Sequence, residues 1–202
     1  MEDTKNGIHL EAYEWDSMWI EQTSRTDAPR VLYIGDSISN VARGYATRES
    51  GNTVLFDGYG TSKAVDNPYF CETVKLFAKQ QRERRLVIFN NGLHGPHLDD
   101  ETEYREHYEK IIKFLLAEFE NTPIALVLST ATAKPERNLR VEARNRAVCD
   151  FAEKYGLPII DLYTVSKLHP EVISEDGIHF LPEGYSLLAK EINKRVREIL
   201  NI

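Results

Sequence analysis

Cysteine is scarce in this sequence, and long apolar runs are missing. Of 202 residues only Cys71 and Cys149 carry a thiol, which excludes the disulfide framework of a small secreted domain and predicts two buried thiols. No window approaches the ~18 apolar residues that a membrane-spanning helix needs. Acidic side chains interrupt the first 20 residues, where a secretory leader would place its apolar segment. We therefore expect a cytoplasmic protein, unless a longer precursor is exported.

Positive charge is also in deficit. The 25 Lys and Arg residues stand against 32 Asp and Glu residues, for a net charge of -7. An acidic surface repels phosphate backbones and anionic lipids, so we expect neither a nucleic-acid nor a membrane partner. The glycine spacings Gly-x-Gly-x-x-Gly and Gly-x-x-x-x-Gly-Lys-Ser/Thr do not occur, and a nucleotide-binding loop is not expected.

Short apolar runs alternate with amphipathic stretches along most of the chain. The runs read as strands buried on both faces, and the stretches as helices with one apolar stripe. Such alternation predicts a parallel sheet covered by helices on both sides, a three-layer α/β/α sandwich. We expect this domain at residues 30–202, with residues 1–29 as an N-terminal extension packed on it through Trp15 and Trp19. The expected strands are 31–34, 53–56, 86–89, 124–128 and 158–160, and the expected helices 71–81, 103–119, 136–155 and 183–200.

Ser37 directly follows the first expected strand, and ligands of open parallel sheets bind at the carboxyl ends of strands. A serine at such a junction is either a helix N-cap or a nucleophile. The second role requires a nearby base, because a free hydroxyl is weakly nucleophilic. His179 is the candidate base. Asp176, three residues earlier in a glycine-containing turn, is the candidate carboxylate that would orient the imidazole.

The loop 90–95 follows the third expected strand and carries further polar groups. Asn91 or His94 would donate a hydrogen bond to the oxyanion of an acyl-transfer reaction, a role worth about 3–4 kcal/mol of barrier. The glycines at 58 and 60 are turn residues or backbone donors to the same oxygen. A metal site built from His94, His97, Asp99 and Asp100 is the alternative for this loop. We do not expect it, because a Gly-Pro loop does not hold the rings together as a helix face would.

Taken together, these motifs resemble those of the SGNH/GDSL hydrolase family. The nucleophile block is Gly35-Asp36-Ser37, the terminal block is Asp176-Gly177-Ile178-His179, and Gly60 best matches the oxyanion glycine, with Gly58 as the fallback. The third block of the family reads Gly-x-Asn-Asp. Here Gly92-Leu93-His94-Gly95 stands in that place, with His94 where the asparagine is expected.

The resemblance implies a flavodoxin-like fold with a five-stranded parallel sheet in the order 2-1-3-4-5. It implies ester hydrolysis by Ser37, His179 and Asp176 without a metal or an organic cofactor. The oxyanion donors would be the amides of Ser37 and Gly60 and the side chain of Asn91 or His94.

Membership leaves the substrate open, since the family includes lipases, thioesterases, phospholipases and carbohydrate deacetylases. Polar and aromatic loop residues favour small-acyl, acetyl-type esters on a carbohydrate. Three alternatives stay open: an acyltransferase with the same residues, a lipase or thioesterase for longer chains, and a non-catalytic flavodoxin-like binding domain in which Ser37 caps a helix. The loop residues are Trp15, Trp19, Tyr59, Asn67, Tyr69, Asn90, Asn91, His97 and Asp99.

Overall fold

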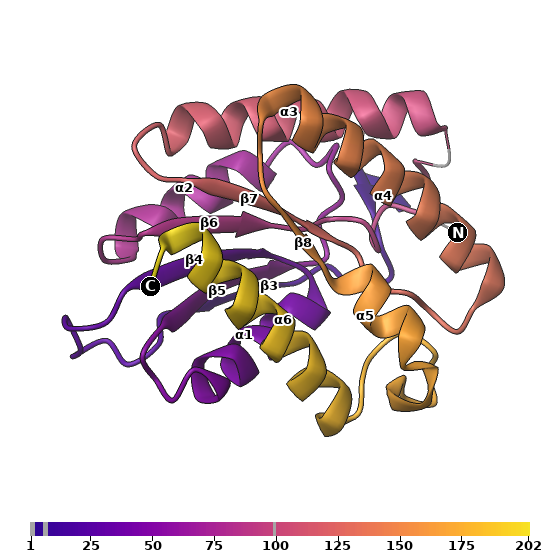
Figure 1. Ribbon diagram of the computed structural model, residues 1–202. Helices are drawn as coiled ribbons and strands as arrows, with labels where there is room; N and C mark the ends of the chain where they lie inside the picture. Colours follow the sequence, from indigo (N-terminus) through magenta and orange to yellow (C-terminus); the bar gives the residue numbers. More distant parts are fainter. Residues whose placement is uncertain (1–2, 6–7, 99) are drawn as a thin grey trace.

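A central sheet with helices on both sides organises the molecule in the computed structural model, which describes residues 3–5, 8–98 and 100–202 (Figure 1). Five strands are parallel and lie in the order β5-β4-β6-β7-β8, which is the expected order 2-1-3-4-5. The predicted α/β sandwich is thus confirmed. These strands are β4 (Arg30–Gly35), β5 (Leu55–Thr61), β6 (Leu86–Phe89), β7 (Ile124–Leu128) and β8 (Ile159–Asp161).

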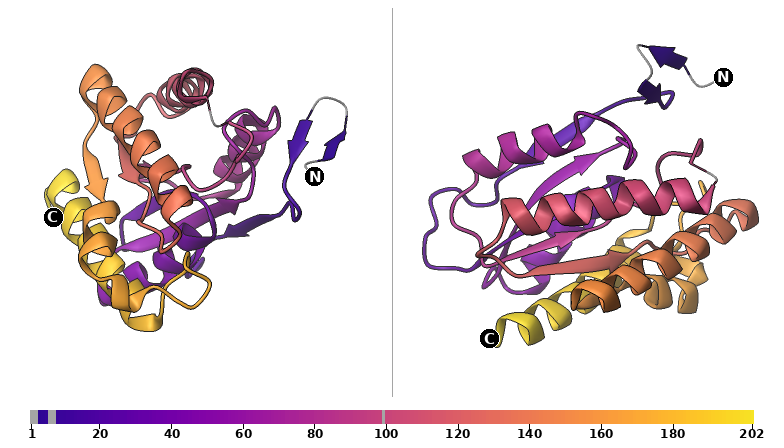
Figure 2. Two further views of the ribbon diagram at one scale, coloured as in Figure 1. Left: turned by 90° about the vertical axis from the view of Figure 1, so that its right-hand side faces the viewer. Right: turned by 90° about the horizontal axis from the view of Figure 1, so that it is seen from above.

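A sixth strand departs from the prediction. β3 (Asp16–Trp19) pairs antiparallel with β5 at the edge of the sheet, so part of the N-terminal extension is built into the domain rather than draped over it. The sequence hides this strand because an edge strand needs no continuous apolar run. Further upstream, β1 (Asp3–Lys5) and β2 (Ile8–Leu10) form a separate antiparallel pair that projects from the body of the molecule (Figure 2).

Within the described residues, six α-helices cover the sheet. The four expected helices are present with ends within two residues of the prediction, whereas α5 and the short 3-10 helix at Pro170–Val172 were not anticipated. One apolar layer packs under α2, α3 and α4, and the other packs under α1, α5 and α6. The helices are α1 (Ser37–Glu49), α2 (Phe70–Gln80), α3 (Glu101–Glu118), α4 (Pro135–Tyr155), α5 (Leu162–Leu168) and α6 (Pro182–Leu200).

β4 shows why the strand sequences are continuously apolar. Leu32 and Ile34 enter one apolar layer, while Val31 and Tyr33 enter the other. Because alternate side chains point to opposite faces, a strand between two helix layers needs apolar residues at every position.

The extension is held by buried polar contacts rather than by both tryptophans. The Arg30 guanidinium donates to Asp57 at 2.8 Å and to the Glu21 carbonyl at 2.9 Å, deep at the start of β4. Trp19 is 52% exposed, with the Arg43 guanidinium 5.2 Å above its ring. Its role as a packed anchor is wrong. Cys149 is likewise exposed, and Cys71 is only half-buried.

Candidate active site

Ser37 is the first residue of α1, at the carboxyl end of β4, and its hydroxyl takes no part in capping that helix. The cap is Asp36, whose carboxylate accepts from the amides of Ile38 and Ser39 at 2.9 and 3.2 Å. Gly35 makes the tight junction possible, because a Cβ there would lie 2.6 Å from Ser39 Oγ. The N-cap interpretation of Ser37 is therefore wrong, and its side chain is free for another partner.

That partner is His179. Ser37 Oγ lies 2.8 Å from His179 Nε2, and His179 Nδ1 lies 2.5 Å from Asp176 Oδ2. An ionised carboxylate only accepts hydrogen bonds, so Nδ1 carries the proton and donates to Asp176. Nε2 then presents a lone pair, which accepts the hydroxyl proton of Ser37. The structure thus brings the three predicted residues together in one hydrogen-bonded row.

The turn between Ser174 and His179 keeps Asp176 ionised. Burial opposes ionisation, but the His179 side chain, the amides of Ile178 and His179, and the Ser174 hydroxyl all donate to this carboxylate and hold its pKa well below its usual range. The side chains of His179 and Asp176 are 41% and 47% exposed. The row therefore lies at an open surface, where a bulky reactant has access.

Gly60 does not present its amide to Ser37. Successive amides of a strand point to opposite neighbours. In β5 the amide of Leu55 donates to the Pro29 carbonyl on the β4 side, and beyond the strand the amide of Ser62 donates to Trp15 on the β3 side. Even-numbered residues therefore face β3, where Gly60 is paired with Ser17. The prediction that the Gly60 amide donates to the oxyanion is therefore corrected, because this amide is directed to the unexpected edge strand β3.

Asn91 is also occupied. Its side-chain Nδ2 donates to the Lys63 carbonyl at 2.8 Å, and its own carbonyl accepts from the Tyr104 hydroxyl at 2.6 Å. The residue is only 3% exposed. These contacts fasten the loop after β6 to the loop after β5 and make Asn91 a structural tie.

His94 stands at the surface side of the same loop and contacts the N-terminal extension. Its Nδ1 lies 3.0 Å from Glu11 Oε1, which also accepts from the Gly95 amide at 3.0 Å. Trp15 packs edge-on against the imidazole, with ring centroids 6.5 Å apart. Burial alone would lower the pKa of His94, but the hydrogen bond and charge of Glu11, with further carboxylates including Asp36, raise it above its usual value. At Glu11 burial raises the pKa of the carboxyl, but the hydrogen bond and charge of His94, the Gly95 amide and the charge of Arg137 together lower it below its usual value.

Arg144, on α4, is a structural residue of this loop that the sequence analysis missed. It is 3% exposed, and its guanidinium lies 4.4 Å over the Tyr104 ring. A signal was present in its spacing, because Arg144 stands three residues after Val141 and four before Val148, on the buried face of the helix. Its two terminal nitrogens donate to four loop carbonyls, those of Gly92, His94, Gly95 and Leu98.

The side chains of the alternative metal site have separate partners. His97 Nε2 contacts Asp66 at 2.7 Å, and Asp100 caps α3. Asp99 lies outside the described residues. Among the residues that the structure describes, no three His, Cys, Asp or Glu side chains gather in a metal-binding arrangement.

Of the eight described loop residues that favoured a carbohydrate, four are buried. Tyr59 is fully enclosed among Phe70 and Phe77, and three of the asparagines are buried as well. Of the remaining aromatic residues, Tyr69 and Trp19 are exposed. These positions therefore supply at most a fraction of the polar and aromatic surface that their sequence order indicated.

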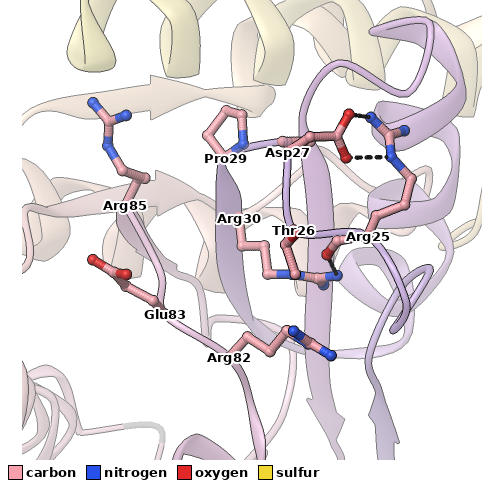
Figure 3. Close-up of a pocket in the computed structure, with 9 residues that line it drawn as sticks. Arg25, Thr26, Asp27, Pro29, Arg30, Arg82, Glu83 and Arg85 are labelled. Atoms are coloured by element: carbon pink, nitrogen blue, oxygen red, sulfur yellow. Dashed lines mark hydrogen bonds and ion pairs between the residues drawn. The ribbon is translucent and has the colours of Figure 1, made fainter.

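A cavity of about 530 Å³ lies elsewhere, among Arg25, Asp27, Arg30 and the loop 82–85. Figure 3 shows the arginines of this cavity, with Arg25 paired to Asp27. Arg30 is the first residue of β4, and Ser37 follows the last. The cavity is therefore at the amino ends of the parallel strands, and Ser37 is at their carboxyl ends. It therefore takes no part in the site described above.

Comparison with solved structures places the fold. No family model matches the sequence, and no curated protein matches it either. A lipolytic G-D-S-L family protein from Veillonella parvula superposes with a TM-score of 0.69 at 18% identity, covering 83% of this chain and 97% of that one. A carbohydrate esterase family 3 structure from Talaromyces cellulolyticus gives 0.66 at 13% identity, covering 86% and 98%.

The catalytic domain of a peptidoglycan O-acetyltransferase from Streptococcus pneumoniae gives 0.66 at 19% identity, covering 87% of this chain and 96% of that one. The chain therefore has the fold of the SGNH/GDSL hydrolases, as its motifs indicated. Within the described residues, no helix is both long and apolar enough to cross a membrane.

Proposed function

We propose that the protein is a serine esterase in which Ser37 is the nucleophile, His179 the general base and Asp176 the carboxylate that orients it. One observation carries the proposal. The Ser37 hydroxyl is not used to cap α1 and lies 2.8 Å from an imidazole nitrogen whose other nitrogen meets an ionised carboxylate. A serine kept for helix capping would not need either contact.

The geometry supports an acyl-enzyme reaction. Ser37 Oγ attacks the carbonyl carbon of the ester, and its proton passes to His179 Nε2. When the tetrahedral intermediate collapses, the bond to the alcohol oxygen breaks and His179 returns the proton to that oxygen. Water then attacks the acyl-enzyme and gives a proton to His179, which passes it to Ser37 Oγ as the bond between Oγ and the acyl carbon breaks and the acid leaves. Asp176 stabilises the imidazolium in both halves.

We assign two donors to the oxyanion. The Ser37 amide opens α1, where the positive end of the helix dipole favours a developing negative charge. The second is His94, because the Gly60 amide is directed to β3 and the buried Asn91 side chain is fixed by the bond from its Nδ2 to the Lys63 carbonyl. This assignment follows the position of His94 in the third motif block.

The exposed position of the row favours an accessible alcohol. A cavity of about 10 Å³ is lined by Asp36 and Ile38, the two neighbours of Ser37 in the sequence, and has room for about one water molecule. The open face at His179 and Asp176 accepts a large alcohol moiety. Among the structural neighbours are an acetyl xylan esterase and a carbohydrate esterase. We therefore propose acetyl esters, with a carbohydrate as the alcohol.

Initial rates on p-nitrophenyl acetate, butyrate and octanoate test this function. We expect the acetate ester to be the best substrate and Ser37→Ala to lower kcat by about 10³-fold or more. Ser186→Ala, on the exposed face of α6, is the matched control and should keep the wild-type rate. If Ser37→Ala retains most of its activity, the assignment of the nucleophile is wrong.

Acyl transfer is a second candidate, favoured by the similarity to an O-acetyltransferase domain and by the open face of the site. A sugar hydroxyl would replace water in the second half of the reaction. Product analysis with and without a carbohydrate acceptor separates the two activities, because transfer lowers the yield of free acid per ester consumed.

A further inference from the structure

We propose that Glu11, from the N-terminal extension, is a positioning residue that holds His94 as an imidazolium, so that a charged Nε2–H faces the oxyanion. The inference rests on the proposed esterase function and deepens it. It assigns a role to a residue 83 positions away from His94 in the sequence, outside every motif described above.

The contacts of the Glu11 carboxylate fix one of the two ring protons. Glu11 Oε1 lies 3.0 Å from His94 Nδ1 and 3.0 Å from the Gly95 amide nitrogen. An ionised carboxylate has no proton to donate, so Nδ1 must carry one. The Gly95 amide holds the same oxygen and keeps the carboxylate aligned with the ring.

The remaining nitrogen then decides whether His94 can act. A neutral imidazole has one N–H, and here it is spent on Glu11. Nε2 would present a lone pair, which repels a developing oxyanion. Only the imidazolium donates from both nitrogens. No hydrogen-bond partner of Nε2 occurs among the contacts of the described residues, and the side chain is 15% exposed, so the ring is partly accessible.

The charges around the ring favour the imidazolium. Glu11 contacts the ring, and the charges of Glu14, also from the extension, and of Asp36, the N-cap of α1, act in the same direction. The nearby positive groups act on other atoms than the ring. Arg144 donates to the His94 carbonyl, and the charge of Arg137 acts on Glu11. The charges of three carboxylates thus favour one imidazolium, and one of the three, Asp36, directly precedes Ser37.

Two histidines with opposite requirements follow from this arrangement. His179 must be neutral to accept the proton of Ser37, whereas His94 must be charged to stabilise the oxyanion. The rate should therefore fall at alkaline pH as His94 loses its proton, whose pKa Glu11 raises. In a single-proton limb the rate changes about tenfold for each pH unit.

The test is the pH profile of kcat on p-nitrophenyl acetate for four proteins: wild type, Glu11→Gln, His94→Asn and Glu109→Gln. Asparagine donates at any pH without charge, so His94→Asn should lose the alkaline fall in rate. Glu11→Gln should move that fall to lower pH with KM unchanged. Glu109→Gln removes the same charge from α3, away from the site, and should match wild type.

His94→Ala should lower kcat by about 10²–10³-fold, the usual cost of one oxyanion donor. The inference is overturned if Glu11→Gln and wild type have superimposable profiles, or if His94→Asn keeps the alkaline fall. Retained activity in Ser37→Ala would overturn the proposed function instead. Histidine ¹⁵N spectra of the Ser37→Ala protein give a readout independent of activity, because an imidazolium has both nitrogens protonated. A neutral His94 at the pH of maximal rate would refute the proposal.

Discussion

Replacing Arg144 with methionine should destabilise the protein strongly and disturb the loop that carries His94. The side chain lies almost wholly inside, and its two terminal nitrogens hold four carbonyls of that loop at 2.6–3.2 Å. Methionine has similar length and keeps the apolar contacts of the stem. The change therefore removes the charge and the donors while preserving most of the volume.

The magnitude follows from the bonds that are lost. Four carbonyls that lose a charged donor cost about 1 kcal/mol each in net stability, and the contact with the Tyr104 ring adds about 1 kcal/mol. Relief of the desolvation of the guanidinium returns about 1–2 kcal/mol. The expected loss is about 3–4 kcal/mol. That is a large part of the ~5–15 kcal/mol by which a domain is stable.

Urea unfolding followed by circular dichroism measures this loss. Arg146→Met is the matched control, since it removes the same charge from an exposed position on the same helix, and should stay within about 0.5 kcal/mol of wild type. Esterase assays at a temperature where both variants are folded should show a lower kcat only for Arg144→Met. If the two variants unfold at the same urea concentration, the four bonds do not hold the loop, and the reasoning fails.

Three further changes test how the site is built. Gly35→Ala brings a Cβ to 2.6 Å from Ser39 Oγ, so overpacking should cost about 1–3 kcal/mol of stability and lower the urea midpoint. An unchanged midpoint would show that the contact is harmless. Asp36→Ala should lose about 1 kcal/mol with its two cap bonds by the same measurement, and a neutral result would remove Asp36 as the cap. Stability should also vary with pH through Glu11 and His94. The pKa of Glu11 is lowered in the folded state, so its stabilisation is present above the unfolded-state pKa and is lost as pH falls through the folded-state pKa. The pKa of His94 is raised in the folded state, so its stabilisation is present below the unfolded-state pKa and is lost as pH rises through the folded-state pKa. In thermal unfolding, the stabilisation by the Glu11–His94 pair should be greatest between the pKa of Glu11 and the pKa of His94. A difference in Tm between wild type and Glu11→Gln that does not vary with pH would contradict this expectation.

Local signals sufficed for the parallel sheet and its main helices. A strand such as β4 is apolar at each inward position because it faces two helix layers, and this produces a run that no exposed segment imitates. The end of α4 could be predicted as well, because Gly156 follows it and glycine readily adopts the left-handed conformation that ends many helices. In the structure Gly156 has a φ of 65°. Such features depend on residues within a few positions of each other.

The row of Ser37, His179 and Asp176 could be assembled from motifs because the topology of a parallel sheet brings the strand ends to one edge. The remaining donors could not. Whether Gly60 offers its amide depends on which strand lies beside β5, and β3 is a short edge strand without an apolar pattern. Whether Asn91 offers its side chain depends on the Lys63 carbonyl, a contact between two loops that no local pattern encodes.

The N-terminal extension links these two departures. Its strand β3 pairs with β5, so the Gly60 amide is directed to β3 and not to Ser37. The segment just upstream of β3 places Glu11 in contact with His94. In the proposed site, one segment therefore removes a backbone donor and supplies the carboxylate that would make His94 donate. A neutral amide at position 94 would not need Glu11, and a lone His94 would present a lone pair to the oxyanion. We infer that the histidine in the third motif block and the added edge strand are parts of one arrangement, each of which needs the other to stabilise negative charge beside Ser37.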